Sequence, residues 1–209
     1  MLDNLVFRLR VLLQGEDFIE SCSAPQADLM RDLDGKSVAV VGNARSLSHG
    51  EHGTAIDDHD LVIRMHRAPL PDARSHGIRT DWLALGMPVP DELISERGPT
   101  RVLWMAKKRK RLTRSLATQP GFYRHPIDDW QALAQELGAP PSTGAMVTDL
   151  VQRSDASRIG LFGFDFFASL SMSGSRTAAQ VPHDFAAEAA RAHRLIETDP
   201  RLVLIRTKD

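Results

Sequence analysis

The feature that most constrains this chain is a short apolar run that ends abruptly at a glycine. Residues 37–41 read Ser-Val-Ala-Val-Val, and Gly42 and Asn43 follow directly. A run of this length bounded by turn residues is typical of a buried strand. A second such run lies within residues 60–69 and carries the polar residues Arg64 and His66 near its end. Because ligands of open parallel sheets bind beyond the carboxyl ends of the strands, these two ends predict a nucleotide-sugar crevice.

The composition is that of one ordinary globular domain. The chain has 209 residues, of which 42% are hydrophobic and 25% charged, and a formal net charge of −1. This balance gives no global argument for nucleic-acid binding. Cys22 is the single cysteine, so an intrachain disulfide is excluded and a reducing compartment is allowed. With no signal-peptide pattern and no apolar run near the roughly 18 residues of a membrane span, we expect a cytoplasmic protein.

Hydrophobic spacing predicts an α/β protein with a single Rossmann-like, mostly parallel sheet flanked by helices. We expect residues 1–35 to form a helical segment packed on the domain, and residues 36–209 to form one α/β catalytic domain. After the two strands above, further strands are predicted at residues 80–85, 101–105, 158–165 and 202–205. Helices are predicted from Ile127 to Leu137, from Ser142 to about Arg153, and from Pro182 onward. Residues 169–180 are small and polar and predict a mobile loop.

The first helix has one apolar face, formed by Leu2, Leu5, Leu9 and Leu12. This face predicts packing on the domain or on a second subunit as a homo-oligomer. Arg8 and Arg10 on the other face leave peripheral membrane contact open as an alternative.

A dense basic run, Lys-Lys-Arg-Lys-Arg, occupies residues 107–111. Such a run is most often a solvated helix face. It could also attract an anionic acceptor glycan, a lipid surface or nucleic acid.

The tetrapeptide Pro141-Ser142-Thr143-Gly144 precedes an apolar helical pattern. Proline fixes the entry of the chain, and Ser142 or Thr143 can cap the helix. The arrangement is that of an ordinary capped helix. It is also a ready anion site, because a helix amino terminus presents backbone N–H groups and the positive end of the macrodipole.

His183 stands where the last long helix is predicted to begin, and Glu188 follows five residues later. The positive end of a helix dipole disfavours protonation of an imidazole, and a neutral imidazole is what a general base requires. Glu188 could fix the tautomer of His183 or satisfy backbone amides. A histidine in this place is otherwise most often a helix cap.

Together these stretches resemble one family. Residues 40–69, from Val-Val-Gly-Asn to Arg-Ala-Pro, look like the large sialylmotif of the sialyltransferases, glycosyltransferase family 29. Residues 77–80 resemble the stretch just after that motif, and residues 141–164 look like the small sialylmotif. His183 and Glu188 fit the very small motif, a histidine and a glutamate separated by four residues.

The resemblance implies a variant glycosyltransferase A fold and an inverting transfer of sialic acid, or a related acid sugar such as Kdo, from a CMP-linked donor. The acceptor would be a hydroxyl of a glycan or glycolipid, and neither a cofactor nor a metal is implied. His183, supported by Glu188, would be catalytic, with His183 taking the proton of the acceptor. The residues implied to contact the donor nucleotide are Gly42, Asn43, Ala44, Arg64, His66, Ser142, Thr143, Gly144 and Gly163.

The sequence departs from the family pattern at several points. His66 stands where the family has asparagine, and residues 171–181 show no counterpart of the third motif. The cysteine pair and membrane anchor of secretory-pathway members are also absent, which suits a bacterial cytosolic version. Two alternatives therefore stay open: a nucleotide-binding relative that has lost transfer, and an unrelated Rossmann-like enzyme. Against the latter, no acidic residue closes the second strand, where a ribose-binding carboxylate would be expected.

Overall fold

Seven parallel strands form one sheet in the computed structural model, which describes residues 2–166 and 181–206. The order across the sheet is β5-β4-β3-β2-β1-β6-β7, and every neighbouring pair is parallel. The strands are β1 (Ser37–Val41), β2 (Leu61–Met65), β3 (Trp82–Leu85), β4 (Arg101–Trp104), β5 (Tyr123–Arg124), β6 (Arg158–Phe162) and β7 (Leu202–Ile205). The predicted α/β fold class is therefore confirmed.

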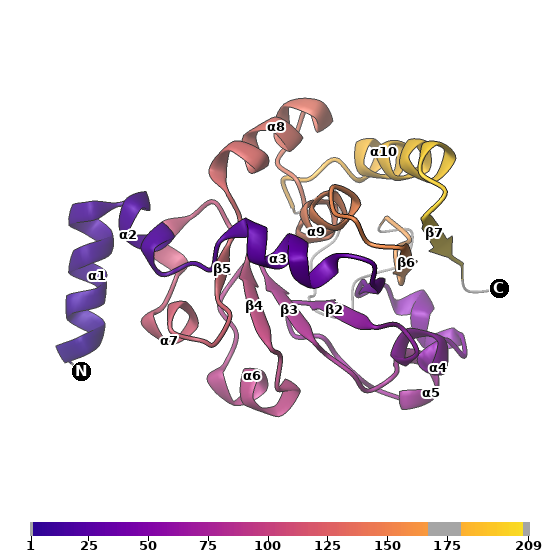
Figure 1. Cartoon of the computed structure of the whole chain (residues 1–209), viewed down its shortest axis with the longest axis horizontal. Coiled ribbons are helices and arrows are strands. Elements are labelled where there is room, and N and C mark those ends of the chain that lie inside the picture. The colour runs from indigo at the N-terminus through magenta and orange to yellow at the C-terminus, as the bar shows by residue number, and fades with distance from the viewer. Residues whose placement is uncertain (1, 167–180, 207–209) are drawn as a thin grey trace.

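Helices cover both faces of this sheet (Figure 1). One layer holds α3 (Gln26–Leu33), α8 (Ile127–Leu137), α9 (Thr143–Gln152) and α10 (Phe185–Thr198). The opposite layer holds α4 (Gly53–Asp57), α5 (Ala73–His76), α6 (Asp91–Arg97) and α7 (Arg114–Ala117). The remaining elements are α1 (Leu2–Gln14), α2 (Glu16–Ser21) and the 3-10 turns η1 (Arg45–His49) and η2 (Arg109–Arg111).

The strands bury alternate residues on opposite faces, as the two-residue period of a strand requires. Val38 and Val40 of β1 join the core beneath α3, α8 and α9. Ala39 and Val41 face the other way and pack with Ile56 of α4. The central strands are thus buried on both sides, which explains why their sequences read as continuous apolar runs rather than as alternating ones.

The chain reverses its direction across the sheet at β1. Strands β2 to β5 are added in succession on one side of β1, whereas β6 and β7 lie on the other. The carboxyl ends of β1 and β6 therefore form a topological switch point, the place where open α/β sheets bind ligands.

The first helix differs from its prediction. Leu5, Leu9 and Leu12 are 65%, 52% and 79% exposed, and Phe7 is the residue of α1 buried in the core. The prediction that the leucine face packs on the domain is wrong. The side of α1 that carries Phe7 packs against α2 and α7 instead. The loop predicted at residues 169–180 lies outside the described residues.

Candidate functional site

The carboxyl ends of β1 and β6 lie in direct contact. The Gly42 amide donates to the carbonyl of Phe162 (2.7 Å), and the Ala44 amide donates to the carbonyl of Gly163 (3.3 Å). A Cβ at Gly42 would lie 2.3 Å from the Gly163 oxygen, and Gly163 itself has a φ of 64°. Glycine is thus required at Gly42 by space and favoured at Gly163 by backbone conformation.

Asn43 bridges the ends of β1 and β2. Its side-chain amide donates to the carbonyl of Met65 (3.2 Å). The half-buried side chain therefore lies at the switch point, next to the turn that carries His66. This is the position in which we predicted a contact with the phosphate or ribose of a donor.

His66 occupies a strained turn at the end of β2. Its φ is 55°, a conformation uncommon outside glycine, and its amide donates to the carbonyl of Ala84 (2.9 Å). A Cβ built at Gly86 would meet both Thr143 Oγ1 (2.7 Å) and His66 Cε1 (3.2 Å), so these three residues converge. The Nδ1 atom of His66 is buried and has no hydrogen-bond partner among the described residues.

The ring of His66 is neutral at physiological pH. Burial lowers the pKa of His66 to about 4, and the nearby His183 acts in the same direction. A neutral imidazole keeps one donor and one acceptor nitrogen. It can therefore take the place of an asparagine amide in one hydrogen bond, but it does not reproduce both the carbonyl and the NH2 group of that amide.

The amino terminus of α9 is capped as predicted, by Ser142. Its hydroxyl accepts from the amide of Ala145 (3.1 Å). The same hydroxyl and the Ser142 amide donate to the two carboxylate oxygens of Glu188, and each of these hydrogen bonds is 2.7 Å long. Next to them, a Cβ at Gly144 would lie 3.0 Å from the ring of Phe164, so the glycine lets this helix end approach the segment after β6.

Glu188 ties α10 to the first turn of α9. Burial raises the pKa of Glu188, while the two hydrogen bonds from Ser142 and the neighbouring His183 oppose that rise. Of the two predicted roles for this carboxylate, satisfying a backbone amide is confirmed.

The tautomer of His183 is fixed by a different group. Its Nδ1 lies 2.8 Å from the carbonyl oxygen of Pro140. Because a carbonyl can only accept, Nδ1 donates, and the lone pair of the neutral ring is on Nε2. His183 precedes Asp184, the N-cap of α10, whose side chain accepts from the amide of Ala187 (2.9 Å). The helix therefore begins two residues later than His183.

The structure places the Arg64 side chain away from this group. Its guanidinium donates to the carbonyls of Arg79 and His76, and each of these hydrogen bonds is 2.6 Å long. Burial lowers the pKa of Arg64 to about 10. Arg79 in turn donates to the carbonyls of Asp57 and His59. Arg64 of the large motif and Arg79 of the stretch after it thus hold the loops around α4 and α5 together, so the guanidinium of Arg64 has a structural role.

Two features of the site were not predicted from the sequence. The carbonyl of Pro140 orients His183, and Gly86 at the end of β3 leaves room for His66 and Thr143. Neither carries a sequence signal, because a backbone carbonyl is present at every position and a glycine after a strand is common.

Among residues 2–166 and 181–206, no group of three or more histidine, cysteine or carboxylate side chains is placed to hold a metal ion. The same part of the chain contains no helix long and apolar enough to cross a membrane.

Comparisons with known proteins point to one family. The family model of glycosyltransferase family 29 (sialyltransferase) matches residues 15–86. Proteins named sialyltransferase-like protein 3 from Oryza sativa subsp. indica and subsp. japonica are each 51% identical to this chain over 47 residues. That segment is 21% of this chain and 12% of each rice protein. The resemblance to family 29 is thereby confirmed.

Solved structures show the same fold. A mammalian sialyltransferase in complex with Gal-beta-1-3GalNAc-ortho-nitrophenol superposes with a TM-score of 0.65 and 16% identity, covering 89% of this chain and 74% of its own. The sialyltransferase CstII from Campylobacter jejuni, in complex with the substrate analogue CMP-3FNeuAc, gives a TM-score of 0.52 and 12% identity over 82% of this chain and 80% of its own. At these identities the likeness concerns the fold.

Proposed function

We propose that this chain, whose residues 15–86 match the model of glycosyltransferase family 29 (sialyltransferase), transfers sialic acid or a related acid sugar from a CMP-linked donor to a glycan hydroxyl. The observation that carries this proposal is the position of His183. Its Nδ1 is held by Pro140 next to the amino terminus of α9, which leaves Nε2 as the proton acceptor.

The proposed donor site is the switch point together with the first turn of α9. The helix end supplies backbone N–H groups and a partial positive charge for the single phosphate of CMP. Thr143 and Gly144 lie in that turn, and Asn43 lies at the end of β1, with its side-chain amide bonded to the carbonyl of Met65. We propose that these groups, without a metal, offset the charge of the leaving nucleotide.

The proposed transfer inverts the anomeric centre in one step. The acceptor oxygen attacks the anomeric carbon as its proton passes to Nε2 of His183. The bond between that carbon and the phosphate oxygen breaks, and CMP leaves with the electron pair. A positioned imidazole can take the proton of an alcohol as the new bond forms, which is the role of a general base.

Glu188 is proposed as a positioning residue rather than as a group that touches the substrate. Both of its oxygens are engaged by Ser142, so it fixes the relative position of α9 and α10. The proposed donor-binding turn is the first turn of α9, and the proposed base, His183, lies just before α10.

A relative that binds the nucleotide without transfer is the second candidate. It is favoured by two observations: the Ser142 hydroxyl is engaged with Glu188, and His66 stands where the family has asparagine. If this candidate is correct, the chain binds CMP but does not release it from a CMP-sugar.

The test is release of CMP from CMP-sialic acid and CMP-Kdo with a panel of glycan acceptors. Replacing His183 with alanine is expected to lower transfer by about 10²-fold or more, since a positioned base contributes on the order of 10²–10⁴. His193→Ala, which removes an exposed histidine of α10, is the matched control. Unchanged transfer in the His183 variant would remove His183 from the base role.

A further inference from the structure

The exposed face of α1 is a nearly continuous apolar surface. Leu5, Leu9, Leu12 and Leu13 are between 52% and 79% exposed, and Val6 is 45% exposed. With 3.6 residues per turn, these side chains lie on the side of the helix opposite Phe7, which packs into the core. Figure 1 shows α1 at one end of the molecule, away from the sheet. A contiguous apolar patch of this kind marks an interaction site rather than an ordinary surface.

Positive charge borders this surface. Arg8 and Arg10 are exposed and lie at the two edges of the apolar face. Arg10 places its guanidinium 5.6 Å from the centre of the Phe18 ring, so its charge stays at the surface while its stem covers apolar atoms.

A second source of positive charge lies behind the helix. Residues 107–114 hold six lysine or arginine residues and no acidic one. This segment reaches α1 because Leu112 and Leu116 share a core cluster with Phe7. Lys108, Lys110 and Arg111 are exposed. A helix with its side chains is about 10 Å across, roughly one Debye length at physiological ionic strength, so these charges act on a surface that contacts α1.

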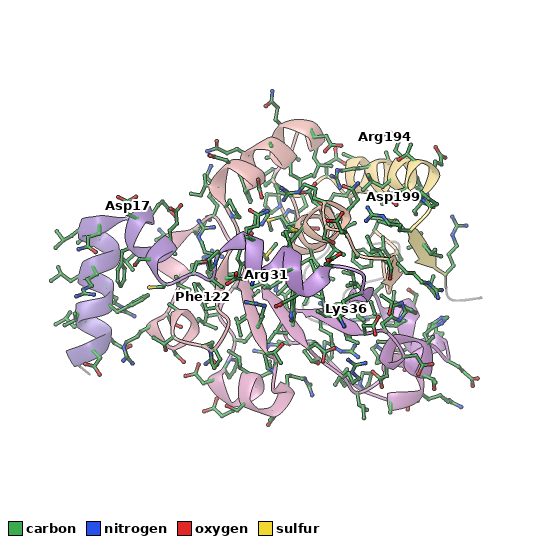
Figure 2. All side chains as sticks on the ribbon, viewed as in Figure 1. Asp17, Arg31, Lys36, Phe122, Arg194 and Asp199 are labelled. Carbon is green, nitrogen blue, oxygen red and sulfur yellow. The ribbon has the colours of Figure 1, made fainter. Side chains whose placement is uncertain are left out.

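The acidic residues nearby are fewer and lie at or beyond the two ends of α1. Asp17, labelled in Figure 2, and Glu20 belong to α2, beyond the carboxyl end of α1. Glu16 of the same helix lies 3.2 Å from the guanidinium of Arg124. Asp3 is the acidic residue of α1 itself. The charge around the apolar face is therefore positive in a chain whose total formal charge is −1.

We propose that the exposed face of α1, with Arg8, Arg10 and the basic segment 107–114, docks on an anionic lipid surface. The apolar side chains enter the boundary of the acyl chains while the basic groups stay at the level of the head groups. A second copy of the chain could cover the leucines, but it would bring two positively charged regions together. An anionic membrane matches both the apolar face and its charge.

Cosedimentation of the full chain with lipid vesicles tests this proposal. We expect binding to vesicles containing phosphatidylglycerol to be at least about tenfold tighter than to pure phosphatidylcholine, and to weaken with salt. Replacing Leu5, Leu9 and Leu12 with serine is expected to abolish binding. Ile78→Ser removes an equally exposed apolar side chain (69%) elsewhere and serves as the matched control. Lys108→Gln with Lys110→Gln is expected to weaken binding roughly tenfold.

A spectroscopic reporter keeps the test independent of any change in folding. The fluorescence of the tryptophan in Leu9→Trp should be quenched by brominated acyl chains, whereas that in Ile78→Trp should not. Equal binding to neutral and anionic vesicles would overturn the proposal. So would a dimer that forms without lipid and is dissociated by the three serine substitutions, because the face would then be occupied by a second copy.

Discussion

The orientation of His183 depends on one backbone carbonyl. The 2.8 Å contact from Nδ1 to Pro140 sets the tautomer, and the proline that follows fixes the direction of the chain at the entry to α9. The partner of Nδ1 is thus an uncharged carbonyl rather than a carboxylate.

Gly42 is the residue for which the structure predicts the sharpest local effect. Alanine there would place a Cβ 2.3 Å from the carbonyl oxygen of Gly163, so the ends of β1 and β6 would have to separate. We expect Gly42→Ala to lower the free energy of unfolding by about 1–3 kcal/mol, the usual cost of overpacking.

The same substitution should weaken CMP binding, because Asn43 would move with the strand end. Urea unfolding and calorimetric titration of CMP measure the two effects on one sample. Unchanged values for both would show that the strand ends are not held together as described here.

At the level of elements, α10 is attached to its neighbours by charged as well as apolar contacts. Arg191 is buried and donates to Glu136 of α8 (2.9 Å) and to Asp149 of α9 (2.6 Å). The helix that carries Glu188 therefore depends for its position on ion pairs made by one buried guanidinium.

Replacing Arg191 with methionine is expected to destabilise the protein by about 2–4 kcal/mol, because it leaves carboxylates without their buried partner. Arg194→Met is the matched control on the same helix. That guanidinium, labelled on the outer side of α10 in Figure 2, is 60% exposed and lies 3.5 Å from Glu136, so its loss should cost less than about 1 kcal/mol. Equal effects of the two substitutions on urea unfolding would contradict this account.

The regular parts of the fold follow from the sequence, whereas short or charge-held elements do not. Strand β7 and helix α8 have the predicted limits, because Pro200 precedes the apolar run of β7 and Pro126 and Gly138 bound α8. Strand β5 was missed because two residues show no period. The buried side of α10 contains Glu188 and Arg191, whose partners come from distant segments of the chain.

The site was predicted to a similar degree. The motifs indicated which residues gather at the switch point, since the carboxyl ends of parallel strands share one edge of the sheet. They could not indicate the face to which a strand side chain points. Arg64 therefore seemed equivalent to His66, although its guanidinium binds loop carbonyls.

At the level of the whole molecule, buried neutral histidines predict acid sensitivity. Burial lowers the pKa of His125, as it does that of His66, to about 4 from an ordinary value of 6.5. Each histidine stays neutral in the folded protein while the unfolded chain takes up a proton. Their contribution to stability is therefore present above pH 6.5 and is lost as the pH falls towards 4.

His125→Leu should flatten this dependence. Between pH 7 and pH 4 the wild-type protein is expected to lose about 2–3 kcal/mol more of its free energy of unfolding than the variant loses. Urea unfolding across that range measures the slope, with the exposed His193→Leu as control. The same slope in wild type and in the His125 variant would show that the buried ring does not carry the effect.

The central claim is that the switch point of this sheet binds the nucleotide of a CMP-sugar. Isothermal titration calorimetry of the full chain with CMP, UDP, NAD and S-adenosylmethionine tests it most directly, since it requires neither the acceptor nor turnover. We expect heat of binding for CMP and its sugar conjugates alone. Preferential binding of NAD or S-adenosylmethionine would contradict the claim.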